Sequence, residues 1–261
     1  MVPQLLFRLS RRTPSLFVIS SGRTGTKGVV ALLAQSPRIL SLHEPTPTGV
    51  EEAKRAYLDG LEGGRYAEFL RRARGQRLFY ARVTGRSYAE ATNMIYLAPL
   101  IAEELPGSRF LFLHRHPGEV VRSGMRRGWY ERHPWDPYRI TPRPDDPAHA
   151  QWPEWDPFEK ICWFWHAANR YILDFVASLD PQRVMVLSFE DYTGGDLESK
   201  RALFRFAGQE PPADDRLTSV VSLKVNAQHT GDFPKYAEWT DAQRDTLRRI
   251  AGPTMERLGY A

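Results

Sequence analysis

Short apolar runs alternate with longer amphipathic stretches along most of the chain. Each short run is typical of a buried strand, and each longer stretch is typical of a helix. The predicted strands are residues 16–19, 38–42, 78–83, 109–114 and 183–188. Because strands that alternate with helices favour a mainly parallel sheet, we predict an α/β fold with P-loop-like, three-layer architecture. We expect one domain over residues 1–261.

The amphipathic stretches predict the helices that flank this sheet. The stretch over residues 50–74 has a break at Gly63-Gly64, where glycine disfavours helix. Pro117 lies in the first turn of another predicted helix, where proline is favoured. The predicted helices are residues 28–33, 50–74, 91–104, 117–125 and 158–179.

Residues 129–157 interrupt the alternation, and we call them the aromatic insert. They are dense in Pro, Trp, Tyr and Asp and show neither helical nor strand periodicity. A loop of this length is usually functional or disordered, and its aromatic content argues against disorder. We favour a lid or substrate wall for the aromatic insert, and a structural cover is the alternative.

Composition narrows the classes of partner. The chain has 36 basic and 31 acidic residues, a net charge of +5, which fits a polyanionic small ligand or a solvated basic surface. We expect no nucleic-acid partner, because no basic run is interleaved with aromatic residues. Cys162 is the single cysteine, so an internal disulfide is excluded. No apolar run approaches transmembrane length, and we expect a cytoplasmic protein without a membrane span.

The segment after the first predicted strand carries the strongest chemical signal. Residues 20–26 read Ser-Ser-Gly-Arg-Thr-Gly-Thr and precede a predicted helix. Glycines let backbone N–H groups face an anion, and a helix start supplies unpaired donors. We call residues 20–26 the phosphate loop, with an ordinary βα turn as the alternative. The predicted anion contacts are Ser21, Gly22, Arg23, Thr24, Gly25, Thr26 and Lys27.

The phosphate loop differs from the Walker A loop of nucleoside triphosphatases. That pattern requires G-x-x-x-x-G-K-[ST], whereas Gly25 here is followed by Thr26-Lys27-Gly28. The departure leaves room for another phosphate-bearing cofactor.

A second candidate anion site follows the fourth predicted strand. Arg115 stands at the strand end, and Ser123 lies eight residues later, about two helical turns into the next helix. An arginine binds phosphate through a bidentate fork, and a serine adds a hydroxyl donor. Taken alone, the pair is better explained as a surface arginine and a surface serine.

In combination, these motifs resemble those of sulfotransferases that use 3′-phosphoadenosine-5′-phosphosulfate (PAPS). The phosphate loop is similar to their 5′-phosphosulfate loop, with Arg23 where the family has Lys or Arg. Arg115-His116-Pro117, followed by Ser123, resembles their 3′-phosphate motif. Residues 186–192 resemble their Tyr-Glu-Asp-Leu segment, with Phe189 replacing the tyrosine. Further resemblance covers the C-terminal cofactor-covering segment and the family's usual ending, at residues 224–226, 230–233, 239–243 and 255–260.

The resemblance spans most of the chain and is missing mainly in the aromatic insert. It implies sulfuryl transfer from PAPS to a hydroxyl or amine of a small-molecule or glycan acceptor, leaving 3′,5′-adenosine bisphosphate (PAP), without a metal. Arg23 would then stabilise the bridging oxygen of the leaving phosphate. Thr24 and Thr26 would hold the 5′-phosphate, and Arg115 and Ser123 the 3′-phosphate. The other implied cofactor contacts are Phe189 and Lys224.

The catalytic base follows from the strand ends. Family members use either a histidine after the third strand or a glutamate after the second. Here the second predicted strand is followed by His43-Glu44, and the third by residues 84–86, which include no histidine. We predict Glu44 as the base and His43 as second choice. The alternative for Glu44 is a structural salt bridge to Arg23 or Lys27.

Two other classes of function remain open from the sequence. One is a P-loop kinase of a small metabolite. Against it, this chain lacks the Walker lysine and a clear strand-end aspartate for Mg²⁺. The other is a non-catalytic protein that keeps the nucleotide-binding fold.

Overall fold

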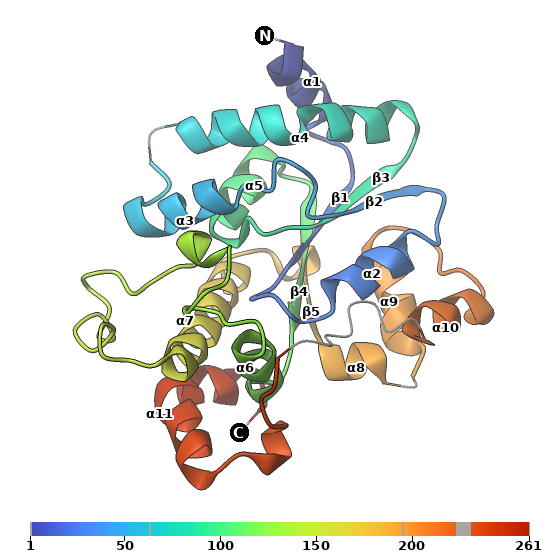
Figure 1. The fold of residues 1–261 in the computed structure, drawn as a ribbon. Helices are drawn as coiled ribbons and strands as arrows, with labels where there is room; N and C mark the ends of the chain where they lie inside the picture. Colours follow the sequence, from blue (N-terminus) through green and yellow to red (C-terminus); the bar gives the residue numbers. More distant parts are fainter. Residues whose placement is uncertain (1, 63, 195, 223–230, 261) are drawn as a thin grey trace.

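A five-stranded parallel sheet forms the centre of the molecule (Figure 1). The computed structural model describes residues 2–62, 64–194, 196–222 and 231–260. The strand order is β2-β3-β1-β4-β5, and every neighbouring pair is parallel. The α/β prediction is therefore confirmed. The strands are β1 (Ser15–Ile19), β2 (Ile39–His43), β3 (Ser87–Ala91), β4 (Ser108–His114) and β5 (Val184–Ser188).

Helices cover both faces of the sheet. Figure 1 shows α2, α9 and α10 on one side and α4, α5 and α7 on the other. None of the described helices is both long enough and apolar enough to cross a membrane. The helices are α1 (Val2–Ser10), α2 (Thr26–Leu33), α3 (Val50–Asp59), α4 (Arg65–Val83), α5 (Ala98–Glu104), α6 (Pro117–Met125), α7 (Pro157–Ala177), α8 (Phe189–Thr193), α9 (Glu198–Phe206), α10 (Asp214–Ser222) and α11 (Asp241–Arg257). Short 3₁₀ turns are η1 (Ile95–Leu97), η2 (Asp136–Tyr138), η3 (Pro181–Arg183) and η4 (Tyr236–Glu238).

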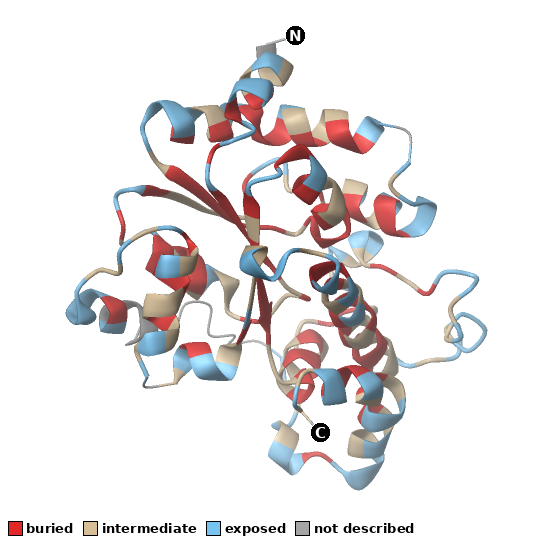
Figure 2. Ribbon diagram, turned by 180° about the vertical axis from the view of Figure 1, so that it is seen from behind, coloured by how far each residue is buried: buried red, intermediate tan, exposed pale blue. Residues whose placement is uncertain are grey.

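Alternate side chains of β1 enter two different cores. Phe17 and Ile19 pack with residues of α4, α5 and α7, whereas Leu16 and Val18 pack with residues of α2 and α9. All four are at most 2% exposed, and Figure 2 shows central strands of the sheet in the colour of buried residues. Burial on both faces explains why this strand reads as a continuous apolar run.

The predicted third strand is wrong. Residues 78–83 form the last turns of α4, and the third strand is β3, from Ser87 to Ala91. A short apolar run does not distinguish a strand from part of a helix. In α4, Leu78 and Ala81 are buried while Tyr80 and Val83 are half exposed or more. Ala91, predicted to begin a helix, is the last residue of β3.

A buried ion pair explains why β3 was hard to recognise. Glu90 lies in the middle of β3 and is fully buried, which an isolated carboxylate would not tolerate. The guanidinium of Arg74 in α4, also fully buried, donates to both Glu90 carboxylate oxygens. The Tyr88 hydroxyl donates to the same carboxylate. The compensating charge sits sixteen residues away on another element, so strand periodicity does not reveal it.

The predicted helices around the aromatic insert are found nearly at their predicted bounds. In α6, Pro117 is the first residue, and the preceding His116 side chain accepts a hydrogen bond from the Gly118 amide. In α7, Asp156 and Glu159 form a capping box that fixes the helix start.

The sheet order brings the predicted site segments to one edge. β1 is central, between β3 and β4, and the chain leaves it first toward β2 and later toward β4. In open parallel sheets, ligands bind outside the carboxyl ends of the strands at such a reversal. The phosphate loop, His43-Glu44 and Arg115 follow β1, β2 and β4 at this edge. The cofactor-covering residues 224–226, including Lys224, lie outside the described residues.

Candidate active site

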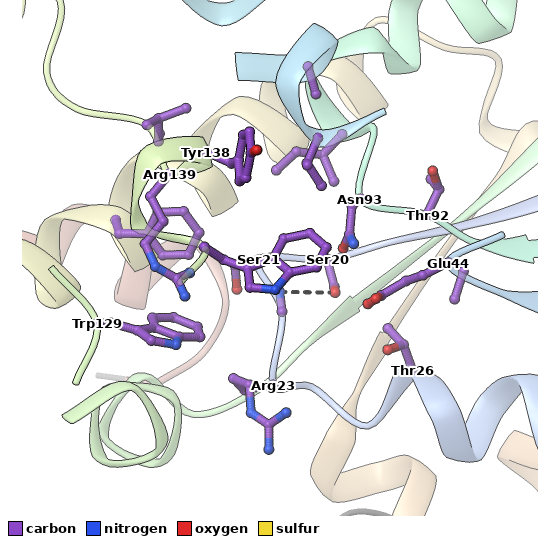
Figure 3. A pocket seen from close by; sticks show the side chains of 18 of the residues that line it. Ser20, Ser21, Arg23, Thr26, Glu44, Thr92, Asn93, Trp129, Tyr138 and Arg139 are labelled. Carbon is purple, nitrogen blue, oxygen red and sulfur yellow. Dashed lines mark hydrogen bonds between the residues drawn. The ribbon is translucent and has the colours of Figure 1, made fainter. Parts of the chain in front are cut away.

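A cavity of about 840 Å³ opens at the carboxyl edge of the sheet. Its walls come from the phosphate loop, the segments after β2, β3 and β4, and the aromatic insert. In Figure 3, Trp129 and Arg139 line one side, Glu44 and Thr26 the other, and Arg23 lies at the edge between them.

The phosphate loop adopts left-handed backbone conformations at three positions. The φ angles are +85° at Gly22, +59° at Arg23 and +86° at Gly25, which is the N-cap of α2. The Gly22 amide donates to the Ser20 hydroxyl at 3.1 Å. The left-handed region costs a non-glycine residue about 1–2 kcal/mol, so Arg23 is held against a local penalty. Such strain is concentrated at functional sites.

Thr24 fits a phosphate ligand. Its side chain is fully buried, and its hydroxyl has no hydrogen-bond partner among the described residues. Buried polar atoms are paired in most proteins, so an orphaned hydroxyl in a glycine-bearing loop suits an anion that completes it. Ser21 is also buried and accepts a hydrogen bond from the Asn169 amide of α7 at 3.3 Å.

Arg23 contacts both Ser123 and Arg115. Arg23 Nε donates to Ser123 Oγ at 2.9 Å, although the residues are 100 positions apart. Arg115 donates through a terminal nitrogen to the Arg23 carbonyl at 3.2 Å, and its Nε is buried without a partner among the described residues. The Arg115 guanidinium therefore reaches the phosphate loop, and the Arg23 guanidinium reaches from this loop to α6.

The cationic side chains of the site destabilise one another. Burial, followed by the charges of Arg127 and Arg115, lowers the pKa of Arg23 to about 10, whereas Glu44 opposes the shift. Burial also lowers the pKa of Arg115, against the effect of Glu119. Arg23 stays charged at neutral pH, so the cluster is stabilised by an anion that binds between these groups.

The Phe189 ring packs against the Arg115 side chain. The Arg115 guanidinium lies 4.2 Å from the centre of the Phe189 ring, a cation–π geometry. The same ring packs against Gly25, where a Cβ atom would lie 2.7 Å from two ring carbons. The predicted cofactor residue Phe189 thus shapes the phosphate loop and lines the cavity.

We expect Gly25→Ala to destabilise the protein more than Gly22→Ala. Both glycines have nearly the same positive φ, but an added Cβ at Gly22 meets no atom within 4 Å. The backbone penalty alone should lower the Tm of Gly22→Ala by about 2–8 °C, and the displaced Phe189 ring should add to this in Gly25→Ala. Thermal unfolding of the two variants measures the difference, and equal Tm values would contradict the steric role of Phe189.

The two candidate bases are neighbours at the end of β2: His43 is its last residue, and Glu44 directly follows it. Glu44 has φ +45°, its amide donates to the Ala91 carbonyl at 2.9 Å, and its carboxylate is 3.7 Å from His43 Nε2. His43 Nε2 is also 3.1 Å from the Thr26 hydroxyl. Burial lowers the pKa of His43, although Glu44 opposes this. Among the described residues, Glu44 pairs with His43 rather than with Arg23 or Lys27 as the structural alternative required.

Different parts of the aromatic insert correspond to the two roles considered from the sequence, a substrate wall and a structural cover. Trp129, Trp135 and Tyr138 line the cavity, as a substrate wall requires. Trp152 instead packs against Tyr130 and Trp163, with ring centroids 5.3 and 5.0 Å apart, as a structural cover requires. The first part of the aromatic insert therefore faces the cavity, and the last part packs on α7.

Sequence reasoning missed several residues of the cavity. Thr92 and Asn93 follow β3 and were hidden by the misplaced third strand. Asn169 supports the phosphate loop from within α7, whose apolar pattern indicates only core packing. Arg139 lines the cavity from within the aromatic insert, where no periodicity signals the direction of its side chain.

Tyr260 of the C-terminal segment and Glu190 contact the histidines on either side of Arg115. The Tyr260 hydroxyl donates to Glu190 at 3.0 Å and lies 2.8 Å from His114 Nδ1. The other Glu190 carboxylate oxygen accepts from the His116 amide at 3.1 Å. His114 and His116 thus have packing and positioning contacts. In the part of the chain described, no cluster of three or more His, Cys, Asp or Glu side chains is arranged to hold a metal.

The sequence matches the model of a known protein family. Residues 14–214 match the model of a sulfotransferase family. The chain therefore belongs to the sulfotransferase family, a class of transferases. The match includes the phosphate loop, the Arg115–Ser123 segment and the aromatic insert, and it does not favour the small-metabolite kinase. No curated protein matches the chain by sequence.

Solved sulfotransferase structures share the fold. A sulfotransferase from Mycobacterium avium superposes with a TM-score of 0.57 at 14% identity, over 94% of this chain and 76% of that one. The sulfotransferase domain from the curacin biosynthetic pathway gives 0.54 at 15% identity, over 96% and 99%. A sulfotransferase from Alicyclobacillus acidocaldarius gives 0.53 at 17% identity, over 93% of each chain. At these identities the likeness concerns the fold.

Proposed function

We propose that this protein transfers a sulfuryl group from PAPS to a hydroxyl or amine of a small-molecule or glycan acceptor. The observation that supports this most is the meeting of two anion-binding elements beside one cavity. The phosphate loop has an orphaned buried Thr24 hydroxyl, and Arg115 has an orphaned buried Nε. Two separated donor sets suit a nucleotide that carries phosphate at both its 5′ and 3′ positions.

The residues present fit this donor. Thr24, Thr26 and the amides of the phosphate loop would hold the 5′-phosphate, and Arg115 with Ser123 would hold the 3′-phosphate. PAPS, when bound, supplies a sulfuryl group activated by its bond to phosphate. Arg23 would stabilise the negative charge that develops on the bridging oxygen, since a fixed cation is most effective where charge appears.

Glu44 would act as the general base. The acceptor hydroxyl loses its proton to the Glu44 carboxylate while its oxygen forms a bond to sulfur. The bond between sulfur and the phosphate oxygen breaks, and both electrons of that bond leave with PAP. The products are a sulfate ester, PAP and a protonated base, so atoms and charge balance. His43, at 3.7 Å from Glu44 and 3.1 Å from Thr26, is placed to orient the carboxylate.

Binding of PAP tests this proposal directly. We expect calorimetric titration without added metal to give micromolar affinity for PAP and at least tenfold weaker affinity for 5′-AMP. Arg115→Ala should weaken PAP by about 30-fold or more, because a charged contact is worth about 2 kcal/mol or more. Arg132→Ala is the matched control, since Arg132 is 83% exposed and does not line the cavity.

The opposite pattern would reject the proposal. Equal binding of PAP and 5′-AMP would remove the 3′-phosphate site. Tighter binding of Mg-ATP than of PAP would favour a nucleoside triphosphate as the ligand instead.

A further inference from the structure

The cavity contains more positive charge than the proposed donor contacts use. Among the described residues that line it, the cations are Arg23, Lys27, Lys54, Arg115, Arg127 and Arg139, and the single carboxylate is Glu44. Arg115 is paired with Glu119 at 3.3 Å, and Arg139 with Asp136 at 2.9 Å. The proposed donor takes Arg23, Lys27 and Arg115. Lys54 and Arg127 remain.

Arg127 lies close to the reacting centre without a carboxylate partner among the described residues. Its Nε is buried and makes no hydrogen bond with them. Its positive charge is the strongest single-residue contribution that lowers the pKa of Arg23. Arg127 follows α6, one helical turn beyond Ser123, and precedes Trp129 of the cavity wall. Two arginines that repel each other in a cavity favour an anion near both.

Lys54 provides a second cation that lines the cavity. Its Nζ donates to the Pro137 carbonyl of η2 at 2.8 Å, which joins α3 to the aromatic insert. Burial lowers the pKa of Lys54, and no carboxylate in the described part of the chain pairs with it. A bound anion would stabilise its charged form.

The part of the cavity wall formed by the aromatic insert is aromatic, and contacts hold its side chains in place. The Arg139 guanidinium stacks 3.7 Å from the centre of the Trp129 ring, and Asp136 holds it in place. His133 Nδ1 accepts a hydrogen bond from the Trp135 amide at 3.1 Å. Aromatic side chains held in this way present flat apolar surface at a low entropic cost. Such a wall suits a ring or an apolar chain.

We propose that the acceptor is an anionic compound with a ring or apolar chain. Its carboxylate, sulfate or phosphate group pairs with Arg127, its apolar body lies against Trp135 and Tyr138, and its hydroxyl faces Glu44. Lys54 adds a further cation for the same class of acceptor. This inference depends on the proposed sulfotransferase function, because it assigns the acceptor part of the same cavity.

Matched probes in the presence of PAP test the inference without a known acceptor. The first pair is 4-hydroxyphenylacetate and 4-hydroxyphenylacetamide, and the second is 12-hydroxydodecanoate and its amide. In each pair the size is nearly constant and only the anionic group is removed. With the protein saturated by PAP, calorimetry should show at least tenfold tighter binding of the anionic member of one pair or both.

Variants test whether Arg127 is the residue that causes the preference for the anionic probe. Arg127→Gln should reduce the preference for the anionic member to less than threefold and leave PAP affinity within threefold. Arg132→Gln, which changes an exposed arginine outside the cavity, should keep the full preference. The Tm of each variant checks folding, and the comparison of probes on the unaltered protein does not depend on any variant.

Three results would overturn the inference. One is that neither probe pair shows tighter binding of its anionic member. Failure of all four probes to bind counts as the same result. Another is a loss of PAP affinity in Arg127→Gln as large as in Arg115→Ala, which would put Arg127 in the donor site. The last is no binding of PAP to the unaltered protein, which would overturn the sulfotransferase proposal itself and this inference with it.

Discussion

Glu44→Gln should lower turnover by about 10²–10⁴-fold, the usual contribution of a general base. Glutamine keeps the size and hydrogen-bonding capacity of the side chain but does not accept the acceptor's proton. PAP affinity should stay within threefold, because Glu44 lies on the wall of the cavity opposite Trp129 and Arg139 and makes no proposed donor contact (Figure 3). The measurement is sulfated product formed from an active acceptor of a phenol and alcohol panel, quantified by mass spectrometry, beside calorimetry with PAP.

His43→Gln is the matched comparison for Glu44. His43 neighbours Glu44 at 3.7 Å and contacts Thr26, so it should reduce turnover by about tenfold or less as a positioning residue. If His43→Gln lost more turnover than Glu44→Gln, the base would be His43. A Glu44→Gln enzyme within tenfold of normal turnover would also reject the assignment of Glu44.

Arg74→Met should be among the most destabilising single substitutions in this protein. It removes the charge that compensates buried Glu90, and breaking a buried ion pair costs about 3–5 kcal/mol. Arg74 also donates to the Pro47 carbonyl at 2.8 Å, three residues after Glu44. For a chain of this size we expect a fall in Tm of roughly 10 °C, measured by thermal unfolding. Turnover should fall as well, since the loop that carries Glu44 loses an anchor.

Arg72→Met is the control on the same helix. Arg72 pairs with Glu68 one turn away, and its side chain is 68% exposed, so its loss should cost no more than about 1 kcal/mol. The double variant Arg74→Met/Glu90→Gln should be more stable than the sum of the single changes predicts, because it removes both buried charges. Strictly additive losses would mean that Arg74 and Glu90 contribute independently.

The candidate site could be read from the sequence where its signal is local. The phosphate loop combines glycines, hydroxyl residues and a helix start within about ten positions, and this combination predicts an anion site without tertiary information. Arg115 and Ser123 were found because Arg115 directly follows β4 and Ser123 lies eight positions later, within α6. Their roles toward a bound donor stay predictions.

The aromatic insert shows where local signals end. Trp129 and Trp152 belong to the same aromatic-rich segment, yet one lines the cavity and the other packs on α7. Without a helical or strand period, nothing local tells which way each ring points. Arg139 was missed for the same reason.

The sequence by itself determined the α/β class, β1 and β4, and the chemistry of the phosphate loop. Strands buried on both faces must be apolar throughout, and an anion loop needs its glycines and cations in immediate succession. Only the tertiary structure decided the position of β3 and the composition of the cavity. Glu90 is tolerable in β3 because Arg74 arrives from α4, and Arg23 meets Ser123 because β1 and β4 are neighbours in the sheet. Both facts depend on pairs of residues distant in sequence, and no local pattern encodes such pairs.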